Sequence, residues 1–213
     1  MTERRRGFTL MELMVVVTII GILAGLAMPS VFASLREMRA SSARADVVRI
    51  LNLGRAAARG TGKAHLLEFN AAAAQTRGQL AAYRSNGSSC ANTDWPTILA
   101  RSNNCATFAT ASPADDDCIA RTAFPNLFEV TNVYAIQLTE ATHNLLYLCY
   151  EPGGRSFWSN QASAASLQPA PPAASNGAFV FTLTTQRGGV GGPTVGVPRQ
   201  ILQPFGSTAR VRR

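Results

Sequence analysis

Cysteine and histidine are the residues of this 213-residue chain with the widest chemistry. They are Cys90, Cys105, Cys118 and Cys149, with His65 and His143. A zinc site needs closely spaced Cys or His pairs, and the sequence has none. Four cysteines allow three disulfide pairings, and the sequence does not choose among them. Proximity along the chain predicts Cys90 with Cys105 and Cys118 with Cys149 as loop-bracing disulfides; free redox thiols are the alternative.

Three short motifs resemble ligand sites, and each lacks a required residue. Gly60–Lys63 resembles a phosphate loop, but Ala57 and Ala64 stand where Gly and Ser or Thr are needed. The acidic run 115–117 lacks the alternating oxygen ligands and distal Glu of a calcium loop. The glycines of 188–192 do not open a helix, as a phosphate site requires. The sequence therefore predicts no metal, no cofactor and no catalytic constellation, and so no enzyme.

Basic residues gather at the C-terminus. Arg210, Arg212 and Arg213 lie within four residues, in a chain whose formal net charge is +8. On a strand, Arg210 and Arg212 point to the same face, and guanidinium groups suit phosphate oxygens. The cluster predicts either a site for the DNA backbone or a solvated basic tail. Phe205 is the aromatic residue nearby, which gives little support to base stacking.

A carboxylate, Glu12, stands at the start of a long apolar segment. Residues 13–35 carry no charge, and residues 8–12 extend the segment enough to cross a hydrocarbon core of about 30 Å. The arginines of 4–6 predict that the N-terminus stays in the cytoplasm. A secretory signal peptide and a plain membrane anchor are two interpretations. Neither explains Glu12, because a charge at mid-bilayer costs roughly 2.5–3.5 kcal/mol and needs a partner.

A third interpretation supplies that partner. Residues 4–13, RRRGFTLMEL, resemble the leader and mature start of type IV pilins and type II secretion pseudopilins. The resemblance implies cleavage by prepilin peptidase between Gly7 and Phe8, and N-methylation of Phe8. It also implies that Glu12 neutralises the N-terminal amine of a neighbouring subunit in a filament. Pro29 stands where many of these proteins carry a helix-kinking proline.

The elements that position these residues follow from the patterning. Helical spacing of Ala43, Val47, Gly54 and Ala58 predicts one helix over 9–58, continuing through Pro29 and stopped by Gly60–Gly62. Strands are predicted at 64–69, 79–84, 128–138, 144–150, 179–185, 199–202 and 209–212. Residues 85–123 are predicted to be a polar loop, and residues 159–177 a mobile low-complexity excursion.

These elements predict an α+β fold, with a long N-terminal helix packed on a C-terminal antiparallel β-sheet domain. The first half of the helix would span the membrane. The predicted segments are a leader at 1–7, a transmembrane and assembly helix at 8–35, an amphipathic continuation at 36–59, and a globular domain at 60–213. A charged content of 15%, against a usual value of about 25%, excludes an acidic disordered chain.

The later segments resemble the GspH/FimT type of minor pilin. The resemblance lies in 146–154 (LYLCYEPGG) and in the terminal residues 201–213. It implies a minor pilin that primes a type IV pilus or sits at its tip, or a minor pseudopilin of a type II secretion system. Some FimT-like proteins capture DNA with C-terminal arginines, which implies DNA as a further partner. The expected location is the inner membrane, then the periplasm or an extracellular filament with other pilins.

Overall fold

The computed structural model describes residues 9–72, 77–91, 95–101, 118–122, 134–160, 167–169, 177–205 and 208–211. Gly7, Phe8, Cys105, the acidic run 115–117, Arg212 and Arg213 therefore lie outside the described residues. The chain divides into two compact units, Met1–Arg39 and Ala40–Arg213. Unit 1 contains the first part of one helix, and unit 2 contains its continuation and all the described strands.

The helix α1 runs from Leu10 to Thr61 and has 52 residues. It continues through Pro29, as predicted, and ends three residues beyond the predicted end. Gly62 follows with a φ of 68°, and its N–H donates to the Ala58 carbonyl over 3.1 Å. A left-handed glycine of this kind satisfies a carbonyl at the helix end without the steric penalty of a Cβ. The glycine signal at 60–62 therefore marks the helix end correctly.

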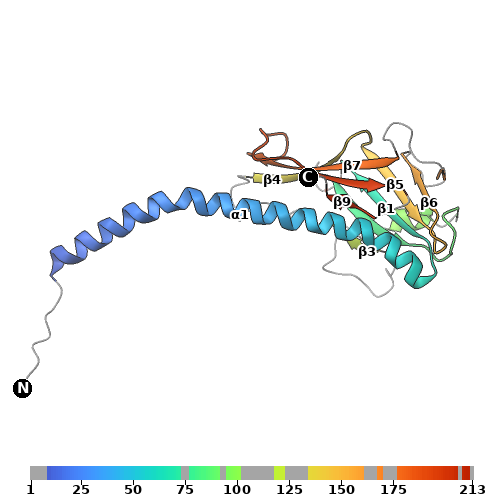
Figure 1. Cartoon of the computed structure of the whole chain (residues 1–213), viewed down its shortest axis with the longest axis horizontal. Coiled ribbons are helices and arrows are strands. Elements are labelled where there is room, and N and C mark those ends of the chain that lie inside the picture. Colours follow the sequence, from blue (N-terminus) through green and yellow to red (C-terminus); the bar gives the residue numbers. More distant parts are fainter. Residues whose placement is uncertain are drawn as a thin grey trace, which may run out of the picture. The chain divides into compact units, whose positions relative to one another are not determined.

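The strands form two antiparallel sheets rather than the single sheet predicted (Figure 1). The five-stranded sheet has the order β3-β2-β1-β5-β6, and the four-stranded sheet has the order β4-β7-β8-β9. The bounds are β1 His65–Asn70, β2 Gln79–Arg84, β3 Cys118–Arg121, β4 Tyr134–Glu140, β5 Leu145–Tyr150, β6 Ser156–Ser159, β7 Ala178–Arg187, β8 Arg199–Pro204 and β9 Arg210–Val211. The α+β fold class, with a long apolar helix on antiparallel strands, is confirmed.

The main core contains residues from α1 and from both sheets. The buried positions of α1 in unit 2 are Ala43, Val47, Ile50, Leu51, Gly54, Arg55 and Ala58, which includes the predicted stripe. They share one cluster with Leu67 and Leu148 of one sheet and Ile136 and Phe181 of the other. Full burial of an aliphatic side chain contributes about 1.5–3 kcal/mol. The second half of α1 is therefore an integral part of the domain.

The helix lies close to the five-stranded sheet at Gly54. A Cβ built at this glycine would lie 3.0 Å from the Leu67 side chain of β1. Any larger side chain would push Leu67 out of a position where it is fully buried. Glycine in a helix interior costs about 1 kcal/mol relative to alanine, so its use here reflects the need for close approach.

A second cluster covers the opposite face of the five-stranded sheet. It joins Leu66 and Tyr147 to Trp95 and Ile98 of a short helix, α3, at Trp95–Arg101. Sequence analysis predicted only a loop there, and the prediction was wrong for α3 and for β3. Seven residues are too few to show helical periodicity, and β3 has only four. Strand β6, also of four residues, was missed for the same reason.

Gly54 and Gly60 offer a matched pair of substitutions in one helix. We expect Gly54→Val to lower the free energy of unfolding by about 1–3 kcal/mol, because it overpacks the contact with Leu67. Gly60→Ala should raise it by up to about 1 kcal/mol, since nothing lies within 4 Å of its built Cβ. Urea unfolding of the full chain in detergent, followed by tryptophan fluorescence, measures both. Equal effects of the two substitutions would contradict the close packing at Gly54.

Candidate assembly site

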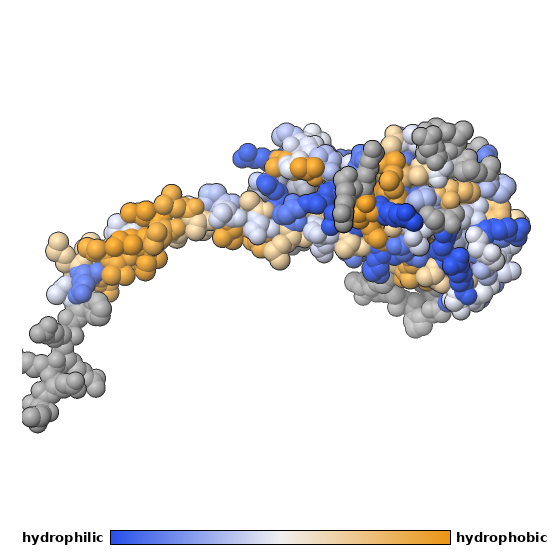
Figure 2. Space-filling view, viewed as in Figure 1, coloured by the Kyte–Doolittle hydropathy of each residue, from blue (hydrophilic) through white to orange (hydrophobic). Residues whose placement is uncertain are grey.

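The first half of α1 presents apolar side chains that nothing in the described chain covers. Leu10 is 79% exposed, Leu23 61% and Leu26 75%. Figure 2 shows this part of the helix as a continuous hydrophobic surface. Among the described residues it is the one helix long and apolar enough to cross a membrane. An uncovered apolar surface of this size marks a site that lipid or other proteins cover.

Thr9 and Glu12 build the start of this helix. The Thr9 hydroxyl oxygen accepts the Glu12 N–H over 3.2 Å, and the Thr9 carbonyl accepts the Leu13 N–H over 3.2 Å. Thr9 is thus the N-cap, and Glu12 stands in the first turn, where the helix dipole favours a carboxylate. The family resemblance implies an assembly role for Glu12, and Thr9 was not among the residues predicted from the sequence. The spacing T-x-x-E, a capping-box pattern, was the available signal.

Two hydroxyl groups of the apolar segment form hydrogen bonds within the helix. The Thr18 hydroxyl donates to the Met14 carbonyl over 2.8 Å, and the Ser30 hydroxyl donates to the Ala27 carbonyl over 2.8 Å. Such internal bonds are what a helix needs where no water is available. Pro29 lacks an N–H and so leaves one carbonyl of the preceding turn without its helical donor. Among residues 9–35, Glu12 is the only ionisable side chain.

The second half of α1 is fixed to the strands by polar contacts as well as by the core. Arg55 is buried, donates to the Ser156 hydroxyl over 3.1 Å, and lies 5.2 Å from the centre of the Tyr150 ring. Burial raises the pKa of Tyr150 to about 12, although the Arg55 charge acts in the opposite direction. The ring and the hydroxyl accommodate the guanidinium inside the fold.

A hydrogen bond also links the helix to the C-terminal strand. The Asn52 side-chain oxygen accepts the Ala209 N–H over 2.8 Å, across 157 residues of sequence. Ala209 is buried beside the helix, and β9 begins at the next residue.

The sequence of this helix is shared with known proteins. Residues 3–28 match the family described as prokaryotic N-terminal methylation motif. The type II secretion system core protein G of Escherichia coli (strain K12) is 41% identical over 51 residues. The chain has the N-terminal signature of the type IV pilins and pseudopilins. The match covers 24% of this chain and 35% of that relative, so about a third of the curated protein is represented. No solved structure matches the chain.

The pilin signature predicted from residues 4–13 is thus confirmed. The resemblance of residues 146–154 and 201–213 to the GspH/FimT type stays a prediction, because the family match ends at residue 28. Processing at Gly7 and Phe8, and the assembly roles of Glu12 and Pro29, also stay predictions.

The disulfide in unit 2 differs from the pairing predicted by proximity. Cys90 is bonded to Cys149, across 59 residues, and Cys118 is also disulfide-bonded. The strand order explains the difference, because β1 pairs with both β2 and β5 and brings Arg84 and Tyr150 to either side of His65. The chain leaving β2 therefore passes close to Cys149 at the end of β5. Separation along the chain was a poor guide to separation in space.

Glu151 secures the segment that carries Cys90. One carboxylate oxygen accepts the Cys90 N–H over 2.9 Å and the Ser89 hydroxyl over 3.1 Å. The other pairs with Arg155, with the closest nitrogen at 2.7 Å. The Trp95 indole N–H donates to the Cys90 carbonyl over 3.0 Å. The disulfide, the carboxylate and the indole together hold α3 over the second face of the sheet.

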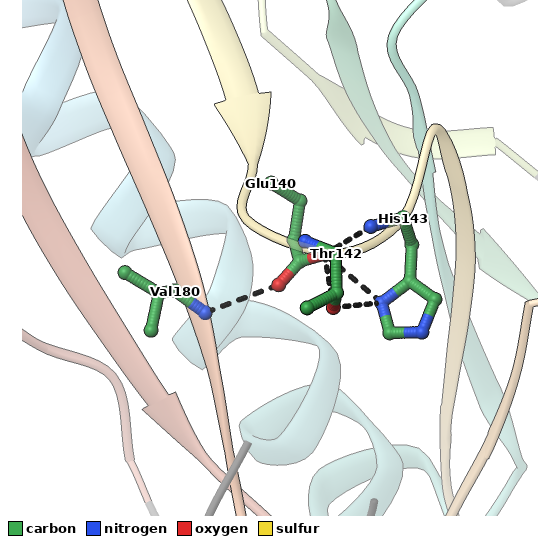
Figure 3. A network of polar contacts seen from close by, with 4 residues as sticks. All are labelled: Glu140, Thr142, His143 and Val180. Carbon is green, nitrogen blue, oxygen red and sulfur yellow. Dashed lines mark hydrogen bonds and ion pairs between the residues drawn. The ribbon is translucent and has the colours of Figure 1, made fainter. Parts of the chain in front are cut away.

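Glu140 holds the crossing from one sheet to the other, as Figure 3 shows. One of its oxygens accepts the N–H groups of Thr142 and His143 over 2.9 and 2.7 Å, and lies 2.9 Å from His143 Nδ1. The other accepts the Val180 N–H of β7 over 3.3 Å. The Trp158 and Phe179 rings pack against His143. In the part of the chain that the structure describes, no group of three His, Cys, Asp or Glu side chains could hold a metal ion.

Glu68 lies on the second face of the five-stranded sheet between two tyrosines. The Tyr83 hydroxyl donates to it over 3.0 Å, and the Tyr147 hydroxyl lies at 3.5 Å. Burial raises the pKa of Glu68, and the two hydroxyls only partly oppose this effect. Burial and the Glu68 charge raise the pKa of Tyr147 to about 12. Glu68 is therefore a carboxylate that folding pushes towards its neutral form.

Of the three C-terminal arginines, the structure describes Arg210. It is exposed on β9, opposite Leu202 of β8.

The raised pKa of Glu68 gives a pH-dependent test of the globular unit. Folding favours the protonated carboxyl, so its contribution is fully present below the ordinary value of 4.5 and is lost as pH rises through the folded pKa. We expect Glu68→Gln to be more stable than the wild type at pH 7, with the gain disappearing near pH 4. Urea unfolding at both pH values measures this.

Asp46→Asn is the matched control, because Asp46 is half exposed and lies 3.6 Å from Arg49. Its stability should stay within about 0.5 kcal/mol of the wild type at both pH values. A Glu68→Gln variant that is destabilised equally at pH 4 and pH 7 would show that burial does not raise the pKa of this carboxyl group.

Proposed function

We propose that this pilin-type chain is a minor pilin that is processed by prepilin peptidase between Gly7 and Phe8 and assembles into a type IV pilus through α1. The observation that carries the proposal is the position of Glu12. It is the one ionisable side chain among residues 9–35, in a helix whose apolar side chains are uncovered. The role is structural, priming assembly or forming the tip, and involves no catalysis.

The charge of Glu12 supports assembly through pairing. Cleavage after Gly7 makes Phe8 the new N-terminus and Glu12 the fifth residue of the mature chain. A carboxylate and an ammonium in an apolar environment are each costly alone and far less costly as a pair. The neighbour's N-terminal amine is then the partner of Glu12, and the pair sets the register between adjacent helices. Pro29 gives α1 a site where it can bend during packing.

The membrane arrangement follows from the same segment. The arginines at 4–6 hold the N-terminus in the cytoplasm, and residues 8–35 cross the inner membrane once. The globular unit then lies in the periplasm, where disulfides such as Cys90–Cys149 persist. Extraction into a filament moves the same helix from lipid to a bundle of pilin helices.

Substitution of Glu12 tests the central step. Glu12→Gln removes the charge and keeps a residue suited to the capping position after Thr9, so the helix start is preserved. We expect normal cleavage after Gly7 and at least a tenfold loss from the sheared filament fraction. Intact mass analysis reports the mature N-terminus, and immunoblotting of the sheared fraction reports incorporation.

Asp46→Asn serves again as the control, since it removes a carboxylate from the same helix outside the apolar segment. It should assemble like the wild type. Normal incorporation of Glu12→Gln would show that pairing of this charge does not drive assembly.

A minor pseudopilin of a type II secretion system is the second candidate. It is favoured by the similarity to the type II secretion system core protein G of Escherichia coli. A deletion strain discriminates: loss of surface pili supports the first proposal, and loss of exoprotein secretion with intact pili supports the second.

DNA capture is a further function that can coexist with the first. Unit 2 has twelve Lys and Arg side chains among the described ones, against four Asp and Glu. Glu140 and Glu151 are buried, and Glu68 is half-buried. The described part of the surface is therefore cationic, and exposed Arg210 heads the C-terminal cluster. Such a surface favours phosphate backbones without reading base sequence.

We expect the chain to bind duplex DNA with a log–log salt slope of roughly −2 to −3. Replacement of Arg210, Arg212 and Arg213 by Ala should abolish this binding, because it removes the three phosphate contacts. Fluorescence anisotropy across a salt series measures the slope, and Arg59→Ala is a control for the loss of an exposed arginine elsewhere. Unchanged binding by the triple variant would show that the three arginines are a solvated tail and not a DNA-binding site.

A further inference from the structure

Arg55 is a buried cation of unit 2 whose charge the fold compensates only in part. It is 8% exposed. Its Nη2 donates to the Ser156 hydroxyl over 3.1 Å, while its Nε is buried without a hydrogen-bond partner among the described residues. No carboxylate of the described residues forms an ion pair with it. Because a buried charge is costly unless it is paired and hydrogen-bonded, this guanidinium group has capacity for an anion.

The Tyr150 ring offsets some of this cost without supplying an anion. Its centre lies 5.2 Å from Cζ of Arg55. Tyr150 of β5 pairs with Ser156 of β6, so the ring and the hydroxyl lie side by side on one face of the sheet. An aromatic face attracts a cation, but it does not take up the remaining N–H donors of the planar guanidinium group.

The Ser156 hydroxyl can donate to the same anion. Its oxygen accepts the bond from Arg55, and its own hydrogen has no acceptor in the described part of the chain. A hydroxyl that accepts one hydrogen bond keeps its proton for another. Ser156 therefore adds a neutral donor beside the buried guanidinium group.

Arg59 brings a second guanidinium group to the same connection. It follows Arg55 by one helical turn, so both side chains leave the same face of α1. A Cβ built at Gly154, two residues before Ser156, would lie 3.6 Å from Arg59 Nη2. Arg59 is exposed, and it too has no carboxylate partner among the described residues. The two arginines thus lie against the β5–β6 connection, one buried and one at the surface.

The acid of this connection is already engaged elsewhere. One oxygen of Glu151 accepts the Cys90 N–H and the Ser89 hydroxyl, and the other pairs with Arg155. Glu151 therefore does not neutralise Arg55 or Arg59. Among the described residues, the place where the last turns of α1 meet this connection combines two guanidinium groups and a hydroxyl without a competing carboxylate.

We propose that Arg55, Arg59 and Ser156, here called the helix-end site, bind a small phosphate-type oxyanion, either inorganic phosphate or a phosphomonoester. Guanidinium groups match phosphate oxygens in geometry. A phosphomonoester carries a charge of about −1.5 to −2 at pH 7, which balances two arginines better than one carboxylate does. Because Arg55 and Ser156 are buried, a small ion can meet all three side chains, whereas the backbone of a DNA duplex would meet only Arg59.

The bound ion would link the last turns of α1 to the β5–β6 connection. All three side chains belong to unit 2, so the proposal does not depend on the membrane-spanning segment or on assembly into a filament.

Titration with inorganic phosphate tests the site in the full chain held in detergent. The line width of the phosphorus NMR signal reports binding, and chloride keeps the ionic strength constant so that screening does not change. We expect saturable binding with a dissociation constant in the millimolar range or below. No saturable binding would overturn the proposal.

Two matched substitutions on α1 show whether the helix-end site is responsible. Arg59→Gln should weaken binding about tenfold, because it removes a charge-assisted hydrogen bond. Arg49→Gln removes another exposed arginine of the same helix and should leave binding unchanged. Equal weakening by the two substitutions would indicate a general charge effect and overturn the site.

Substitutions of the buried donors extend the test. Arg55→Gln should abolish binding and Ser156→Ala should weaken it, in variants that circular dichroism and the Cys90–Cys149 linkage show to be folded. Arg59→Gln changes an exposed side chain, so it decides the matter even where a buried substitution unfolds the chain. Full phosphate binding by a folded Arg55→Gln variant would also overturn the proposal.

Competition identifies the class of ligand. Methyl phosphate should displace inorganic phosphate if the site accepts a monoester, and should fail to do so if the site takes the free ion alone; both results agree with the proposal. Acetate should compete at least about tenfold more weakly than phosphate, since it has one charge and two oxygens. Equal competition by acetate would overturn the phosphate assignment. Duplex DNA binding that is lost in Arg59→Gln would overturn the assignment to a small ion.

Discussion

The burial of the second half of α1 against two sheets is the interaction on which the rest of the structure depends. Val47 and Ile50 have no exposed surface, and Gly54 brings the helix into contact with Leu67. An isolated helix is marginally stable in water, and packing of one face supplies most of its stability. Because α1 is continuous, the packed half supports the uncovered half. The same helix is therefore part of a core at one end and presents an uncovered apolar surface at the other.

Polar side chains fix the helix and the connections between strands around this core. Arg55 secures the helix to β5 and β6, Glu140 closes the crossing between the sheets, and Glu151 fixes the segment that carries Cys90. Each of these charges has several local partners, which is the condition under which buried charge is tolerated. The carboxylates are used internally while most arginines remain outside. The cationic surface of unit 2 thus follows from how the interior is built.

Local pattern was sufficient for much of the fold. The stripe from Ala43 to Ala58 has the period of a helix, and 79–84 and 199–202 have the composition of strands, so these elements could be predicted. The N-terminal signature could also be predicted, because its residues are adjacent in sequence. The Cys90–Cys149 disulfide could not, since it depends on β1 lying between β2 and β5. Burial of Arg55 depends on Ser156 and Tyr150, about a hundred residues away.

Two contacts between residues far apart in the sequence limit how early the fold can be completed. Strand β1 pairs with β5 from His65–Tyr150 to Asn70–Leu145, and Asn52 meets Ala209 across 157 residues. Contacts of such separation make folding slow. At about 5–20 residues per second, synthesis places roughly 8–30 s between Asn52 and Ala209. During that interval the packed half of α1 lacks its contact with Ala209. The packing of the second half of α1 is therefore completed only when the segment around Ala209 has been made.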